Sequence, residues 1–323
     1  MSASAPANDR RAGRELWRIA AGVVVGLFLA GLILLGMRTG SRLSLWFFVQ
    51  GRFWLALGAL IVLAWGTIAS LRRRPFVQRG RLVLLVGCAL VFGVVNLPFP
   101  YPSPREGRPS AVPFRLPFEG AWTTIWGGAT TDGNRLAAFY PDRRFGYDFT
   151  VVDEDGRRFA GTGERPEDWL AFGRPVLAPC AGTVERVQDG LPDVAPGLRA
   201  PDADPNGNHV VLRVAQGEYL FLGQLRQGSI VVGPGQLVEP GDPIGEVGSS
   251  GASPVTPFPH LAIHLQTTPE SRWGAGVPLR FSEVECPGRD CLDAADPRGG
   301  IDRGGRLVGD VVRPASADPR PGD

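Results

Sequence analysis

Two of the three histidines in the chain lie four residues apart in the stretch FPHLAIHLQ, residues 258–266. Polar and apolar residues alternate along it, which predicts a β-strand with one aliphatic face. The other face carries His260, Ala262 and His264. Imidazoles presented in this way serve as metal ligands or as general bases. The stretch therefore has the pattern of a metal or catalytic site whose middle position is an alanine.

The two histidines of this face cannot bind the same metal ion in a regular strand. Four strand residues span ~13 Å, whereas a zinc–nitrogen bond is ~2 Å long. The remaining histidine, His209, lies in GNHVVL, residues 207–212. We interpret His209 as a strand residue that pairs with a neighbour; a replacement metal ligand is the alternative.

The elements that must position these residues are predicted to be strands. The chain contains 44 glycines and 30 prolines, which favours strands and turns over long helices. The segments that alternate or are rich in β-branched residues are FGYDFTVVD, PVLAPCAGTVERVQ, NHVVLRVA, EYLFLGQL, PIGEVG and HLAIHLQ. The sequence therefore predicts an all-β domain over residues 117–285.

Three uncharged apolar segments, residues 19–37, 53–71 and 82–99, precede this domain. Each is close to the ~20 residues that a helix needs to cross a bilayer. Arginines cluster before the first segment and between the second and third, and they are fewer between the first and second. By the positive-inside rule, residues 1–18 are expected in the cytoplasm and the β domain outside it.

Two further segments flank the β domain. Residues 100–116 are rich in proline and predict a linker that lifts the domain off the membrane. Residues 286–323 begin with CPGRDC and continue as a polar tail that we expect to be disordered. Cys286 and Cys291 could close a disulfide loop in an oxidising compartment, and half of a zinc site is the alternative.

Composition removes some classes of function. A formal net charge of +2 argues against a dedicated nucleic-acid-binding protein. The chain contains no lysine, since all of its basic residues are arginines. Two segments, PVLAPCAGTVERV and GQLVEPGDPIGEVG, have short strands that turn at a glycine. Biotinyl- and lipoyl-type carriers share this motif, but they need an acceptor lysine. The absence of lysine therefore excludes a carrier of this type.

Several motifs together resemble one family. GTVERV, GNHVVL, EYLFLGQL, GSIVVGPGQLVEPGDPIGEVGSSGAS and PHLAIHL follow in the order and spacing of the lysostaphin/LytM-type zinc metalloendopeptidases. The resemblance covers about residues 122–281. It implies an antiparallel β-sheet core with a duplicated hybrid motif. It also implies a relation to bacterial peptidoglycan, whose peptides members of this family cleave, and this suits a domain outside the cytoplasm. From this and the three apolar segments, we expect a protein integral to the bacterial cytoplasmic membrane.

Only some of the family's zinc-binding and catalytic residues are present at the matching positions of this chain. Asp148 in FGYDF matches a zinc ligand of the family, and His260 matches its general base. Arg144 and Ala262 stand where the other two zinc ligands are expected, and Gln224 stands where the family has a helper histidine. His209 and His264 are then interpreted as groove-lining residues. Arg144 could neutralise the Asp148 carboxylate in place of a metal ion.

Two functions remain open. The first is a non-catalytic member of this family that needs no cofactor and that binds peptidoglycan or regulates a cell-wall hydrolase. Three replaced positions, Arg144, Ala262 and Gln224, favour it. The second is an active zinc endopeptidase with a rearranged site, which Asp148 and His260 favour.

Overall fold

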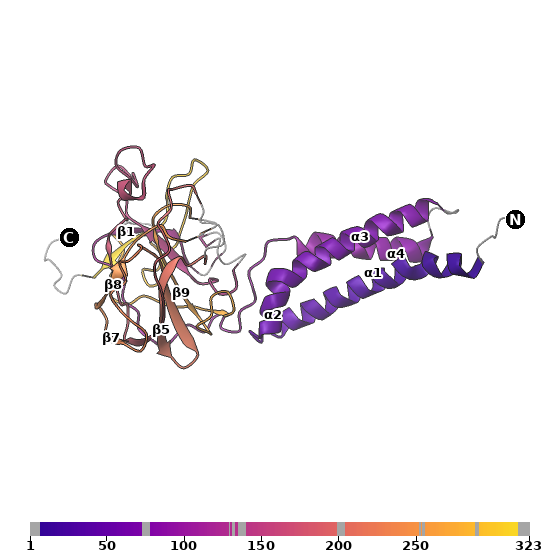
Figure 1. The fold of residues 1–323 in the computed structure, drawn as a ribbon, viewed down its shortest axis with the longest axis horizontal. Helices are drawn as coiled ribbons and strands as arrows, with labels where there is room; N and C mark the ends of the chain where they lie inside the picture. Colours follow the sequence, from indigo (N-terminus) through magenta and orange to yellow (C-terminus); the bar gives the residue numbers. More distant parts are fainter. Residues whose placement is uncertain are drawn as a thin grey trace. The chain divides into compact units, whose positions relative to one another are not determined.

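The computed structural model describes residues 7–72, 78–128, 130, 133–134, 140–198, 204–251, 253, 256–287 and 291–315. The chain divides into two compact units, Met1–Pro102 and Ser103–Asp323. The first unit is helical and the second is built from strands (Figure 1). Each unit is described by itself below.

The helical unit contains α1 (Ala7–Gly36), α2 (Arg42–Trp46), the π-helix η1 (Phe47–Gly51), α3 (Arg52–Leu71) and α4 (Arg79–Val95). Within the described residues, two helical stretches are long and apolar enough to cross a membrane, Leu16–Gly36 and Arg42–Leu71. The second begins eleven residues before the predicted segment 53–71, because α2, η1 and α3 follow one another without a break. α4 has 17 residues, or ~26 Å of helix, which is shorter than a ~30 Å hydrocarbon core.

Small side chains allow these helices to approach closely. Ala21, Ala59 and Cys88 come from α1, α3 and α4, and each is fully buried in one apolar cluster. Gly66 of α3 lies against the ring of Trp17, since a Cβ atom at this glycine would come within 2.8 Å of that ring. A larger residue at Gly66 would push α1 and α3 apart.

The second unit is an antiparallel β domain, as its alternating sequence predicts. Its strands are β1 (Trp122–Trp126), β2 (Tyr147–Thr150), β3 (Pro175–Leu177), β4 (Gly182–Gln188), β5 (Asn208–Ala215), β6 (Glu218–Leu225), β7 (Leu237–Val238), β8 (Pro243–Glu246), β9 (Leu261–Gln266), β10 (Gly276–Val277), β11 (Val284–Glu285) and β12 (Val311–Pro314). A 3₁₀ turn, η2 (Pro166–Asp168), lies between β2 and β3.

The large sheet has the order β11-β12-β1-β2-β9-β6-β5-β4-β7, with β10 paired to β9, and β3 pairs with β8 in a second sheet. Its centre is therefore made of strands that are far apart in the sequence. β5 and β6 are joined by a tight hairpin whose Gly217 has a φ of 69°, a conformation that glycine adopts without strain. The aliphatic face of β9, which includes Leu261 and Leu265, belongs to the main apolar core.

From Ser103 onward, the segment predicted to be a free linker is packed against the β domain. The Ser103 hydroxyl donates to the carbonyl oxygen of Gly276 at 2.7 Å. Buried Glu218, at the start of β6, accepts from Arg105 and from the Ser110 hydroxyl, each at 2.5 Å. Residues 103–116 therefore pack as part of the β domain instead of forming a free spacer.

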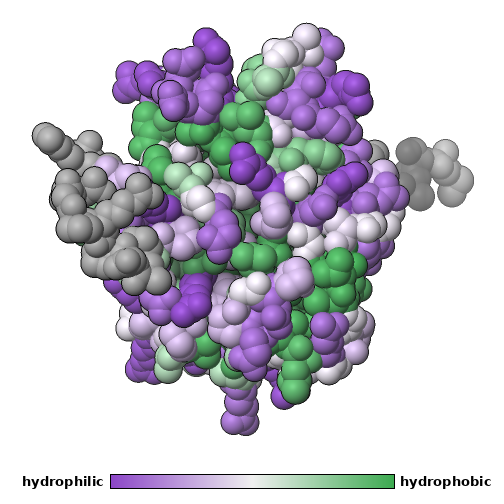
Figure 2. Space-filling model, turned by 90° about the vertical axis from the view of Figure 1, so that its left-hand side faces the viewer, coloured by the Kyte–Doolittle hydropathy of each residue, from purple (hydrophilic) through white to green (hydrophobic). Residues whose placement is uncertain are grey.

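The predicted disordered tail is also partly ordered. β12 pairs with β1, and Val312 is fully buried beside Trp122 of the core. A disulfide joins Cys286 and Cys291. The remaining residues of this segment, 288–290 and 316–323, lie outside the described residues. On the face seen in Figure 2, hydrophobic residues are interspersed with hydrophilic ones, as on the surfaces of most soluble domains.

Candidate functional site

Four neighbouring strands place one row of residues on the same face of the large sheet. Asp148 in β2 is paired with Ala262 in β9, and Ala262 is paired with Gly223 in β6. Gly223 is paired in turn with His209 in β5. Opposite residues of antiparallel strands present their side chains on one face, with Cβ atoms ~4.5–5.5 Å apart. The sheet therefore brings together residues that lie more than 100 positions apart in the chain.

This row is an interior feature. His260 and His264 lie two residues to either side of Ala262 and share its face. Both histidines are 1% exposed, Asp148 is 0% exposed and His209 is 8% exposed. The positions predicted to line a groove, His209 and His264, are thus buried side chains of the cluster.

Three side chains surround the carboxylate of Asp148. The Thr256 hydroxyl donates to Oδ2 at 2.7 Å. Nε2 of His260 lies 3.6 Å from the same oxygen. Nη2 of Arg143 lies 3.9 Å from Oδ1, and this arginine is only 2% exposed. A buried charge needs an opposite charge nearby, and the guanidinium of Arg143 provides it.

The arginine beside Asp148 is not the predicted one. Nη2 of Arg144 instead bonds Oε1 of Glu106 at 2.7 Å. The two arginines precede β2 in a turn that is closed by a hydrogen bond from the Gly146 amide to the Arg143 carbonyl. Successive residues of such a turn point in different directions, so only one of them reaches Asp148. A Cβ atom at Gly146 would lie 3.0 Å from the Cβ atom of His264, so a larger residue in this turn would crowd β9.

His260 is held in one tautomer. Its Nδ1 lies 2.6 Å from the carbonyl oxygen of Phe258 and donates the proton, because a carbonyl can only accept. Burial lowers the pKa of His260, and the charge of Asp148 acts in the opposite direction. In the neutral ring, Nε2 presents a lone pair to the Asp148 carboxylate. Within the described part of the chain, neither Nε2 nor Oδ1 of Asp148 has a hydrogen-bond partner.

His264 is packed as an aromatic side chain. Its ring stacks on Phe221 with centroids 4.7 Å apart and an angle of 16° between the planes. Phe221 also stacks on His209 at 5.8 Å. Burial lowers the pKa of His264 well below its usual value, and the positive charge of Arg143 adds to this effect. A neutral ring that packs on Phe221 is the form that this environment favours.

The donors around Asp148 do not fit a catalytic zinc ion. Such an ion takes three protein ligands and keeps one position open for water. Asp148 and His260 supply two donors, Ala262 supplies none, and Arg143 brings a positive charge to the place of a cation. Among the residues that the structure describes, no group of three histidine, cysteine or acidic side chains could hold a metal ion.

Gln224 performs a different task from that of the family's helper histidine. Its Nε2 donates to the carbonyl oxygen of Pro205 at 2.8 Å, and its Oε1 accepts from the amide of Gly251 at 2.9 Å. It also adopts a φ of 65°, which is uncommon for a residue other than glycine. Gln224 therefore joins two loops at the end of β6, and both of its amide atoms are used.

Replacing Gln224 with alanine is expected to lower the free energy of unfolding by about 2 kcal/mol, because two buried backbone groups lose their partners. Thermal unfolding of the full chain in detergent would measure this loss. The matched control is Gln236→Ala, which removes one exposed contact to the Gly233 amide and should change stability by less than ~0.5 kcal/mol. Equal effects of the two substitutions would contradict the role of Gln224 in joining the loops.

Arg143 and Thr256 are the two site residues that were missed at the level of sequence. The double arginine of DRRFG was a signal for the first, since either guanidinium could turn toward Asp148. Thr256 carries no such signal. It belongs to the loop that precedes β9, and only the tertiary fold brings its hydroxyl to Asp148.

Comparison with known proteins agrees with the resemblance found in the sequence. Residues 168–272 match the model of Peptidase family M23, a range that includes His260 and Ala262 but not Asp148. The chain is thereby confirmed as similar to the lysostaphin/LytM-type peptidases over this part of its length. No significant match exists among curated protein sequences.

Several solved structures are similar to part of this chain. A peptidase M23 protein from Pseudomonas aeruginosa is 20% identical over 53% of this chain and 49% of its own, with a TM-score of 0.29. A catalytic-domain variant of the M23 protein EnpA from Enterococcus faecalis is 21% identical over 51% and 94%, with a TM-score of 0.32. A zinc-containing peptidase from Vibrio cholerae is 21% identical over 53% and 41%, with a TM-score of 0.31. The chain thus spans less than half of the Pseudomonas and Vibrio chains.

Proposed function

We propose that this chain, whose residues 168–272 match Peptidase family M23, holds a non-catalytic domain of that type at a bacterial membrane. The domain binds peptidoglycan or regulates a cell-wall hydrolase, and it cleaves no peptide bond itself. Asp148 and His260 are then structural residues of the buried cluster. The proposal needs no cofactor.

The observation that carries this proposal is the pairing of Asp148 with Ala262 beside the guanidinium of Arg143. An alanine cannot ligate a metal ion, and an arginine opposes the binding of one. Burial supports the same conclusion, because a scissile carbonyl must reach the reacting atoms. Asp148 and His260 are 0% and 1% exposed.

Membrane anchoring rests on the two helical stretches that are long and apolar enough to cross a bilayer. We also propose a third span over the apolar segment 82–99, which extends beyond the 17 residues of α4. With three spans, the distribution of arginines favours a β domain outside the cytoplasm. The Cys286–Cys291 disulfide supports this orientation, since such bonds persist in oxidising compartments.

The full chain, purified in detergent, is expected to sediment with peptidoglycan sacculi or to change the rate of a cell-wall hydrolase, while it releases no muropeptide fragments on its own. Sedimentation and chromatography of the soluble products measure these outcomes separately. Cleavage that is abolished both by a chelator and by His260→Ala would overturn the non-catalytic assignment.

An active zinc endopeptidase with a rearranged site is the second candidate. The observation in its favour is that His260 Nε2 lies 3.6 Å from Asp148 Oδ2, so two buried atoms that can bind a metal ion are close together. Elemental analysis of the purified chain separates the two candidates. Stoichiometric zinc that survives dialysis would support the enzyme, and its absence would support the binding domain.

A further inference from the structure

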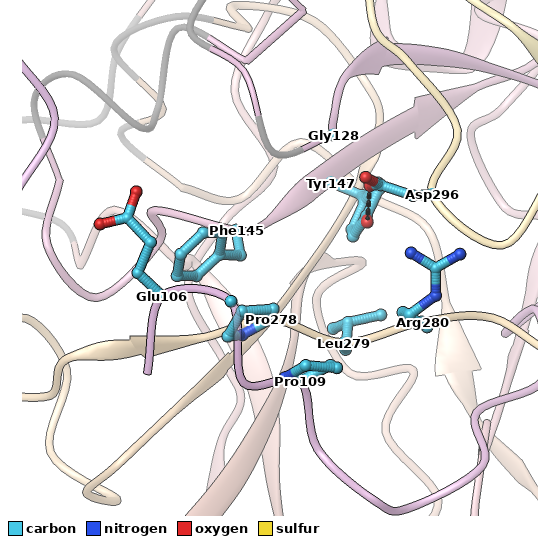
Figure 3. A pocket seen from close by; sticks show the side chains of 10 residues that line it. Glu106, Pro109, Gly128, Phe145, Tyr147, Pro278, Leu279, Arg280 and Asp296 are labelled. Carbon is cyan, nitrogen blue, oxygen red and sulfur yellow. Dashed lines mark hydrogen bonds between the residues drawn. The ribbon is translucent and has the colours of Figure 1, made fainter. Parts of the chain in front are cut away.

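A second polar site lies on the other face of the sheet from Asp148. Tyr147 is its neighbour along β2, so the Tyr147 ring points the opposite way. Beside this ring is a pocket of about 290 Å³ (Figure 3). Its walls include Phe145, Pro109, Pro278 and Leu279. Such a volume suits one amino-acid side chain rather than a large cofactor.

One carboxylate is oriented at the wall of this pocket. The Tyr147 hydroxyl donates to Oδ1 of Asp296 at 2.6 Å, as the dashed line in Figure 3 marks. Burial and the charge of Asp296 raise the pKa of Tyr147 well above its usual value, so the phenol stays protonated and remains a donor. This bond uses one carboxylate oxygen and leaves Oδ2 of Asp296 available to a ligand.

The charges that line the pocket leave an excess of one negative charge. Glu106 pairs with Arg144 at 2.7 Å, and Arg280 pairs with Asp293 at 2.5 Å. The Asp296 carboxylate accepts from a neutral phenol and also lies near the Arg280 guanidinium, whose pKa is raised by the hydrogen bond with Asp293 and by the charge of Asp296. Two carboxylates, Asp293 and Asp296, therefore share one guanidinium at this end, and the remaining negative charge is complementary to a single cation.

Between its charged residues, Glu106 at one end and Arg280 and Asp296 at the other, the wall of the pocket is apolar. Phe145, Pro109, Pro278 and Leu279 surround the space between Glu106 at one end and Asp296 at the other in Figure 3. An aliphatic chain would cover these side chains and remove apolar surface from water. A ligand that combines an aliphatic stem with a terminal cation would satisfy both parts of the pocket.

We propose that this pocket binds a primary ammonium group on an aliphatic stem, as in a peptide that carries a lysine-type side chain. Oδ2 of Asp296 accepts from the ammonium, and the stem lies along Pro278 and Leu279. The chain contains no lysine, so a second copy cannot supply such a side chain. The occupant comes from a different molecule. This inference goes beyond the proposed function and does not depend on whether the Asp148 cluster is catalytic.

Two probes that differ only at the terminal group test the proposal on the full chain in detergent: Nα-acetyl-lysine amide and Nα-acetyl-norleucine amide. Ligand-observed saturation-transfer NMR should detect the lysine probe, with an affinity about tenfold higher than that of norleucine, because one charge-assisted hydrogen bond separates them. Equal affinities, or no binding of the lysine probe, would overturn the proposal.

A variant then locates the site. Asp296→Asn keeps an oxygen that can accept from Tyr147 but removes the charge, and it should lower the affinity for the lysine probe about tenfold. Asp155→Asn is the matched control, since this aspartate is exposed and pairs with Arg157 outside the pocket. Binding that is unchanged in Asp296→Asn contradicts the site. If this variant does not fold, the comparison of the two probes on the unmodified chain decides alone.

Discussion

Replacing Arg143 with methionine is expected to lower the free energy of unfolding by about 3–5 kcal/mol, because the substitution leaves the Asp148 carboxylate buried without an opposite charge. Methionine keeps much of the volume of the arginine stem, so the effect comes mainly from the lost charge. Asp148 is 0% exposed and cannot turn toward water. The melting temperature, measured by near-ultraviolet circular dichroism of the full chain, should fall by about 10 °C.

A double-mutant cycle separates the ion pair from general damage to the core. In Asp148→Asn alone, Arg143 becomes the unpaired buried charge, and a similar loss is expected. The double variant removes both charges and should be more stable than either single variant, since neutral buried side chains avoid the desolvation cost. Arg186→Met, which breaks an exposed ion pair with Glu270, should cost less than about 1 kcal/mol. Strictly additive losses would contradict the pairing of Arg143 with Asp148.

The second large effect concerns metal binding. A chain with both Ala262→His and Arg143→Ala is expected to bind about one zinc ion, because it would offer three ligands without a competing guanidinium. The introduced imidazole would stand directly opposite Asp148 and two residues from His260. Elemental analysis after dialysis and competition with a chromogenic chelator would measure the stoichiometry and the affinity.

The control for this experiment adds Asp148→Ala to the same two substitutions. It retains both imidazoles but removes the carboxylate, and zinc should be lost on dialysis. If the two-substitution variant is folded and yet binds no zinc, the strand pairing does not bring these donors to one point. Stoichiometric zinc in the unmodified chain would contradict the role assigned to Arg143 and favour an enzyme.

The strands could be expected from the alternation of polar and apolar residues. That Asp148 and Ala262 belong to one site followed only from the resemblance to the metallopeptidase family, and the strand pairing confirms that they lie opposite each other. The identity of the charge partner could not be expected. Arg143 and Arg144 are chemically identical, and their directions depend on the turn closed between Arg143 and Gly146. The contacts of Gln224 could not be expected for a related reason. Its left-handed backbone turns the side chain into the loops, and no sequence pattern marks such a conformation at a glutamine.

The linker shows a different limit of sequence reasoning. Proline-rich composition predicts an extended spacer over residues 100–116. Tyr101 in this stretch is instead 0% exposed, and its ring packs against Phe48 of the helical unit. The same stretch carries Phe114 and Leu116, whose side chains are 0% and 5% exposed in the core of the β domain. Apolar side chains within a proline-rich segment were the available signal that it packs. The polar C-terminal segment likewise carries an apolar residue, Val312, that is fully buried.

The ion pair between Arg143 and Asp148 also constrains how this sequence can evolve. A chain that gains histidine at position 262 first must fit a large ring beside a guanidinium in a closed interior, which overpacks it. A chain that first loses Arg143 leaves the Asp148 carboxylate buried without an opposite charge. Either single step is expected to lower stability, so a zinc site is regained without a destabilised intermediate only when positions 143 and 262 change together.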